Sequence, residues 1–129
     1  MIKLKRLSLV LIITAFSSCS DNDDSLTQQD EAQKLEEMFA EIKALSTSEP
    51  CIDASQWTFT SYGSKACGGP IGYIAYSLKI DTALFLKKIE EHRKAQQEFN
   101  NKWGLNSDCS VPTKPEGVTC ENGKPQFIF

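Results

Sequence analysis

The longest regular stretch of this chain is a predicted helix over residues 82–103, and the rest of the fold has to be built around it. At 1.5 Å per residue such a helix is about 33 Å long, which is the full width of a small domain. Asp81 is a favourable N-cap residue, and Gly104 is a typical C-terminal stop. We expect one face of the helix to cover a hydrophobic core, because it carries a largely apolar stripe made of Phe85, Ile89, His92, Gln96, Phe99 and Trp103.

A second, amphipathic helix is predicted over residues 27–45. Apolar side chains recur there at three- and four-residue spacing, namely Leu35, Met38, Phe39, Ile42 and Leu45. Thr27 with Asp30 three residues later indicates an N-terminal cap, and Pro50 lies beyond the expected end of the helix. The stripe is most simply explained by docking on the domain core. The alternative is a helix that binds a partner.

An antiparallel hairpin is predicted between the two helices. Its strands cover residues 56–62 and 71–77, and a glycine-rich turn at residues 67–70 lies between them. Tyr73 and Tyr76 fall on opposite faces of the second strand, so at least one of them should reach solvent or the rim of the domain.

A second hairpin is predicted over residues 118–129. Asn122-Gly123 supplies the two positive-φ residues of a type I′ turn, and Pro125, which has no N–H, places the final strand at a sheet edge. The order helix, hairpin, helix, hairpin predicts an α+β fold. In it, a small antiparallel sheet of three or four strands packs against the long helix, beside the N-terminal helix.

The first 18 residues have the pattern of a secretory signal. An apolar run over residues 9–16 is too short to span a bilayer as a helix. It follows three cationic residues, Lys3, Lys5 and Arg6. We therefore expect residues 1–18 to be an export signal that is removed from the mature protein.

The end of this segment, Ser17-Ser18-Cys19, resembles the lipobox of bacterial lipoproteins, in which the cysteine is lipidated and becomes the new N-terminus. By that resemblance Cys19 carries the anchor, residues 19–26 are a flexible tether and residues 27–129 form one domain. In proteobacterial lipoproteins an Asp directly after the lipidated cysteine retains the protein in the inner membrane, so Ser20 implies the outer membrane. The acidic residues that follow resemble the surface-export signal of Bacteroidetes lipoproteins, the alternative being a solvated spacer. The domain is similar to small disulfide-stapled flavobacterial lipoproteins. The resemblance implies an exported, lipid-anchored protein of the outer membrane, on its periplasmic or its cell-surface side.

The mature chain expected from this processing is acidic. The sequence has 14 Lys and Arg against 17 Asp and Glu, a formal charge of −3, and removal of the three cationic residues in the signal makes this about −6. An acidic domain has no electrostatic attraction for nucleic acid, so we expect no nucleic-acid partner. The expected partners are the membrane, through the lipid, and an unidentified protein or glycan.

Four cysteines remain once Cys19 is assigned to the lipid, and an even number in an exported domain predicts two disulfides. Sequence proximity favours Cys51–Cys67 and Cys109–Cys120, while the other pairings, which would tie the first hairpin to the last, stay open. A zinc site is the competing interpretation, but the sequence has no CxxC pair and a single histidine. We expect no metal and no cofactor.

Candidate catalytic groups are few. His92 lies near the apolar stripe of the long helix, where it is either a packed histidine or a general base that works with Glu91 or Asp108. Glu90 and Glu91 point about 100° apart on a helix and cannot form a glycosidase pair without a further carboxylate. We predict that the protein is not an enzyme.

The predicted function is that of a lipid-anchored, non-catalytic binding module of the cell envelope, one specific form being an inhibitor of a foreign hydrolase. Four aromatic residues are candidates for ligand contact, namely Trp57, Tyr62, Tyr73 and Tyr76. The alternatives are a small envelope enzyme that uses His92, and an accessory subunit whose N-terminal helix docks on an outer-membrane complex. Asp24-Ser25-Leu26 resembles the O-glycosylation motif of Bacteroidetes, which makes Ser25 a candidate glycosylation site.

Overall fold

The computed structural model describes residues 26–129. In chain order its elements are α1 (Gln28–Ser46), the short 3₁₀ helix η1 (Ala54–Gln56), β1 (Trp57–Tyr62), β2 (Gly72–Ser77), α2 (Thr82–Trp103), β3 (Gly117–Glu121) and β4 (Lys124–Ile128). This confirms the α+β class, and the bounds of the long helix are those expected from the sequence. The expected signal, the lipidation site Cys19 and Ser25 lie outside the described residues.

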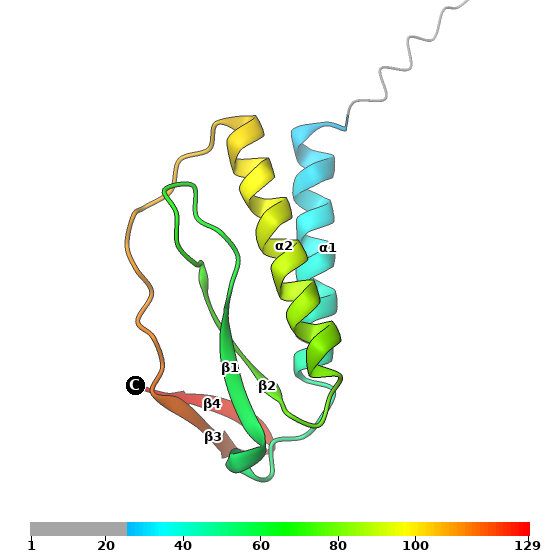
Figure 1. Ribbon diagram of the computed structural model, residues 1–129, viewed down its shortest axis with the longest axis vertical. Coiled ribbons are helices and arrows are strands. Elements are labelled where there is room, and N and C mark those ends of the chain that lie inside the picture. The colour runs from blue at the N-terminus through cyan, green and yellow to red at the C-terminus, as the bar shows by residue number, and fades with distance from the viewer. Residues whose placement is uncertain (1–25) are drawn as a thin grey trace, which may run out of the picture.

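The elements form three layers (Figure 1). α1 and α2 lie side by side and cover one side of the β1–β2 hairpin, and the β3–β4 hairpin lies on the other side. β1 and β2 are antiparallel, in register from Trp57↔Ser77 to Tyr62↔Gly72. The second pair, β3 and β4, is antiparallel around the turn at Asn122 and Gly123, whose φ angles of 51° and 76° fit the expected type I′ turn.

The hairpins form two separate two-stranded sheets, so the single sheet of three or four strands predicted from the sequence is wrong. Their aromatic side chains explain the arrangement. Phe59 of β1 and Phe127 of β4 meet edge to face, with ring centroids 6.0 Å apart. The hairpins therefore pack through their side chains instead of joining through strand edges.

The core lies between the helices and the β1–β2 hairpin. Ile42 of α1 and Phe85 of α2 are fully buried there, and Tyr76 and Ile89 beside them are nearly so. The ring of Tyr76 lies 4.5 Å from that of Phe85, centroid to centroid. The prediction that the α1 stripe docks on the domain core is thus confirmed.

Side-chain caps define where both helices begin. Thr27 and Asp30 form the expected capping box at α1. At α2 the carboxylate of Asp81 accepts the backbone N–H of Leu84 at 2.9 Å, and Gly104 ends the helix in the left-handed region with φ 58°.

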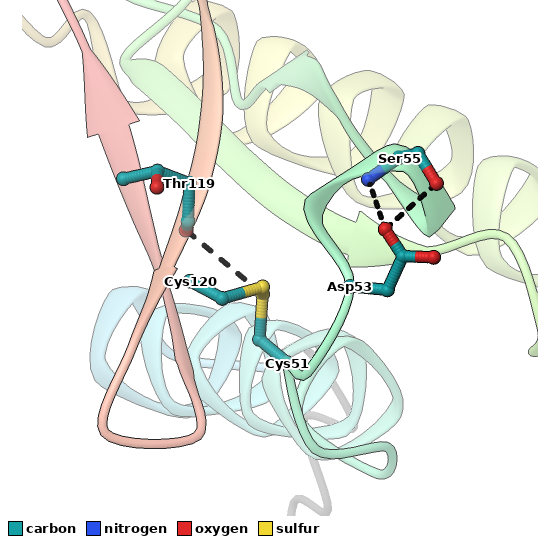
Figure 2. Close-up of a disulfide and its surroundings, with 5 residues drawn as sticks. All are labelled: Cys51, Asp53, Ser55, Thr119 and Cys120. Atoms are coloured by element: carbon teal, nitrogen blue, oxygen red, sulfur yellow. Dashed lines mark hydrogen bonds between the residues drawn. A yellow bond between two sulfur atoms is a disulfide. The ribbon is translucent and has the colours of Figure 1, made fainter.

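A disulfide joins Cys51 to Cys120, across 69 residues of sequence (Figure 2). The backbone N–H of Cys51 donates to the carbonyl oxygen of Gly123 at 2.9 Å, so the segment after α1 is bound to the β3–β4 turn. Cys67 and Cys109 are free thiols. The pairings favoured by sequence proximity, Cys51–Cys67 and Cys109–Cys120, are therefore wrong, because tertiary docking brings together cysteines that are distant in sequence.

Candidate functional site

A groove lies beside β2, between the C-terminal half of α1 and β4. Its first hollow, of about 330 Å³, is lined by Phe39, Lys43, Ser46, Thr47, Tyr62, Tyr73, Ile74, Ala75, Pro125 and Phe127. A second hollow, of about 510 Å³, is lined by Gly72, Tyr73, Pro112, Thr113, Pro115, Phe127 and Phe129. Tyr73 and Phe127 line both hollows, so the two adjoin. We call the pair of hollows the β2 groove.

The aromatic walls of the β2 groove support one another. Phe59 lies edge to face with Tyr73 at 5.9 Å between centroids, and Phe127 and Phe129 are 6.1 Å apart. On the helix side, Phe39 stacks on Tyr62 at 4.6 Å. Because each ring is packed against another, a ligand would meet a surface that is already ordered.

The structure divides the four aromatic residues predicted to contact a ligand into two pairs. Tyr62 and Tyr73 line the β2 groove. Trp57 and Tyr76 are each only 7% exposed, so their prediction as ligand contacts is wrong. Strand alternation predicts which residues share a face, but it does not tell which face meets the helices.

Sequence reasoning missed Phe127 and Phe129 as groove residues. Phe129 is 70% exposed, which makes it the most accessible of the aromatic side chains in the β2 groove. A signal was present in the sequence, because Pro125, Phe127 and Phe129 recur at a spacing of two and so share one side of an extended chain.

The charge of the β2 groove differs from that of the chain. Lys43 is the only charged residue among those that line its two hollows. No acidic side chain within residues 26–129 forms an ion pair with it. A protein with a net charge of −3 thus presents an apolar groove with one unneutralised positive charge.

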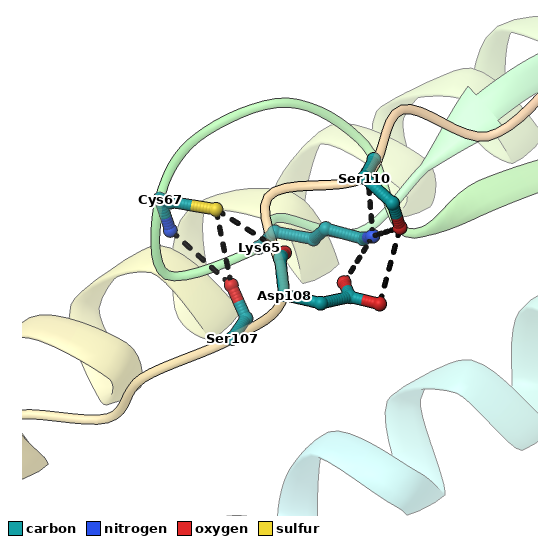
Figure 3. A network of polar contacts seen from close by, with 5 residues as sticks. All are labelled: Lys65, Cys67, Ser107, Asp108 and Ser110. Carbon is teal, nitrogen blue, oxygen red and sulfur yellow. Dashed lines mark hydrogen bonds and ion pairs between the residues drawn. The ribbon is translucent and has the colours of Figure 1, made fainter.

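Apart from the β2 groove, a polar cluster joins the loop of the first hairpin to the loop after α2 (Figure 3). The Lys65 ammonium lies 2.7 Å from the Asp108 carboxylate and donates to the carbonyl oxygen of Ser110, also at 2.7 Å. The Lys65 side chain is only 15% exposed, and the bond it makes holds the pKa of Asp108 below its ordinary value. These contacts fix the two loops to each other.

The two free thiols belong to this cluster. The neighbouring Cys109, assisted by Ser107, lowers the pKa of the Cys67 thiol, and Cys67 in turn raises the pKa of the Cys109 thiol. Cys67 also contacts the carbonyl oxygen of Asp108 at 3.2 Å. The thiols are therefore neighbours, as a second disulfide would require, although in this structure they are not bonded.

His92 lies inside the helix layer and does not reach an open site. It is 4% exposed, and its ring centroid is 5.5 Å from that of Phe39. Burial lowers the pKa of His92, partly offset by a hydrogen bond to the backbone of Leu35. Neither proposed partner assembles with it, since Glu91 is exposed and pairs with Lys87 while Asp108 is bound to Lys65. The geometry is that of a packed histidine.

Comparison of the chain with protein-family models, with curated proteins and with solved structures finds no match. Across residues 26–129, no three His, Cys, Asp or Glu side chains are grouped so that they could hold a metal ion. Neither α1 nor α2, the helices of the described part, is long and apolar enough to cross a membrane. The interpretation of function therefore depends on the β2 groove.

Proposed function

We propose that this protein is a lipid-anchored, non-catalytic binding module of the cell envelope, which holds a protein ligand in the β2 groove. The observation that carries the proposal is the groove itself. Packed aromatic rings around a concave surface are the usual energetic centre of a protein interface, because they bury large area at low cost in side-chain entropy.

The position of the groove suits a module tethered at its N-terminus. The chain enters the domain at the N-terminal end of α1, whereas Lys43, Ser46 and Thr47 of the groove lie at the other end of that helix (Figure 1). A lipid on Cys19 would hold the first end near the membrane. The groove would then lie roughly 20 Å further out, as 15 helical residues separate Gln28 from Lys43.

Capture from envelope extracts tests this function. The bait is the full chain, in comparison with Phe129→Ala and with a control, Ile52→Ala, which shortens an exposed apolar residue (83% exposed) that lines neither hollow. We expect one partner that binds the wild type and the control but binds Phe129→Ala about 30-fold more weakly, the effect of losing a hot-spot side chain. Equal binding to all three proteins would contradict the proposal.

A glycan array separates the two classes of ligand. Tyr73 and Thr113, two residues with hydroxyl groups, line the second hollow among apolar residues, and a neutral sugar binds to surfaces of this mixed kind. Array signals that disappear in Phe129→Ala would show that the ligand of the β2 groove is a glycan and not a protein. The intact mass of the envelope protein tests the anchor independently of the groove. We expect the mass of residues 19–129 plus acyl groups on Cys19.

A further inference from the structure

We infer that the ligand of the β2 groove is an extended peptide segment, which adds to the free edge of β2 as a third strand and places an acidic group beside Lys43. The inference depends on the proposed function, since it names the kind of segment that the groove binds and how it is bound. Four features of the described residues support it.

The first feature is that β2 has an open edge. Its only strand partner within residues 26–129 is β1, and three consecutive β2 residues, Tyr73, Ile74 and Ala75, line the groove. An unpaired strand edge presents backbone N–H and C=O groups to which another extended chain can bind.

The second feature is the direction of the backbone groups. The N–H of Leu78 donates to the carbonyl oxygen of Gln56 at 2.8 Å, which makes this pair a hydrogen-bonded one. Such pairs alternate along an antiparallel ladder. With the register Thr58↔Tyr76 and Thr60↔Ile74, the backbones of Tyr76 and Ile74 bond to β1, and those of Tyr73 and Ala75 point toward the groove.

The third feature is that the residues of this edge do not themselves block pairing. Natural edges are commonly blocked by proline, lysine or a bulge. β4 carries both Lys124 and Pro125, whereas the groove-lining part of β2 carries neither a proline nor a charge. The edge of β2 is therefore available for pairing in a way that β4 is not.

The fourth feature is the position of the walls. Side chains of an added strand would point alternately to the helix side, where Phe39 lies, and to the hairpin side, where Phe127 lies. Both walls are apolar, so apolar side chains fit at successive positions. The unneutralised Lys43 at the helix wall favours a carboxylate, either of a side chain or of a chain end.

A peptide library provides the test. Random twelve-residue peptides displayed on phage are selected on the full chain, and the enriched peptides are synthesised. We expect sequences with consecutive apolar residues and one acidic group. Hydrogen–deuterium exchange of the complex should show two additional protected amides in residues 72–77, those of Tyr73 and Ala75, because the amides of Ile74 and Tyr76 are already bonded to β1.

Matched proline variants test the backbone contact. Ala75→Pro removes an outward N–H without removing a bond to β1, and should weaken peptide binding at least tenfold. The control is Ser61→Pro, at the β1 residue opposite Tyr73. The N–H of Ser61 points away from β2, to the other edge of the sheet, so its loss should leave peptide binding unchanged. Lys43→Glu should weaken binding of acidic peptides, whereas Lys34→Glu, which changes the net charge equally from the same helix, should not.

N-methylated peptides give the same test without altering the protein. Methyl groups on alternate amides that face β2 should abolish binding, and methyl groups on the other alternate amides should not. If both sets bind equally, strand addition is wrong. If that occurs while Phe129→Ala still weakens the same peptides, the binding function stands without it.

Two further outcomes would also overturn the inference. Concentration-dependent dimerisation that Ala75→Pro abolishes, with no peptide selected, would assign the edge of β2 to a second copy of the chain. A library that yields no peptide sensitive to Phe129→Ala, together with no captured protein and no glycan signal, would remove both the inference and the proposed function.

Discussion

Removal of the Cys51–Cys120 disulfide should lower the free energy of unfolding by about 4 kcal/mol. The two cysteines are 69 residues apart, and closing a loop of that length in the unfolded chain corresponds to roughly 4.4 kcal/mol at 25 °C in the chain-entropy description. A domain of this size is stabilised by about 5–15 kcal/mol in total. The melting temperature should therefore fall by more than about 15 °C.

The double variant Cys51→Ala/Cys120→Ala tests this value in urea titrations, because it leaves no unpaired thiol at the site. Its m-value should rise, since the unfolded chain without the cross-link exposes more surface. The control is Cys67→Ala/Cys109→Ala, compared with wild-type protein in which alkylation shows that both of these thiols are free, as they are in the structure. A loss below about 1 kcal/mol, or an equal loss in the control, would refute the reasoning.

Three other predictions follow from single features. Burial holds the pKa of His92 below its ordinary value of 6.5, so the unfolded chain binds this proton at higher pH than the folded one. The free energy of unfolding should therefore decline as the pH falls below about 6.5, by at most about 1.4 kcal/mol per pH unit. In urea titrations at pH 7, 6 and 5, His92→Leu should remove this decline. Gly63→Ala should destabilise the protein by more than about 1 kcal/mol, because φ is +73° and the new Cβ would lie 2.7 Å from Cδ1 of Ile71. Gly68→Ala, at φ +92° with open space around it, should lower the melting temperature by less than Gly63→Ala does. Mild oxidation of the purified protein should join Cys67 to Cys109 without dimer formation, as read from peptide mapping, and dimers linked through Cys67 would contradict the placement of the two loops.

Local rules predicted the helices and turns of this protein well. The bounds of α2 follow from Asp81 and Gly104, and the tight turn of the second hairpin follows from Asn122-Gly123, because each signal acts on residues next to it. The disulfide could not be predicted in the same way. It depends on how the segment after α1 docks on the β3–β4 turn, which is a tertiary contact.

The β2 groove was only partly predictable for a related reason. Its walls come from α1, β2 and β4, which are far apart in the sequence. Phe39 was assigned to the core stripe of its helix, and it also forms a wall of the groove. The alternation along β2 predicted that at least one of Tyr73 and Tyr76 reaches solvent or the rim, and the structure shows that this residue is Tyr73, since Tyr76 is buried.

The Cys51–Cys120 bond also has a mechanical consequence. It closes residues 51–120, including β2, into a covalent ring, and α1 lies outside that ring. If the protein is anchored at Cys19 and pulled through a ligand on β2, the force must pass through α1, which is bound to the ring by the chain after Ser46 and by side-chain packing. Tension would therefore act on the packing of α1 against α2 and the β1–β2 hairpin, which no cross-link within residues 26–129 reinforces. The groove would then lose Phe39 and Lys43, so the grip on the ligand would weaken as the load increased.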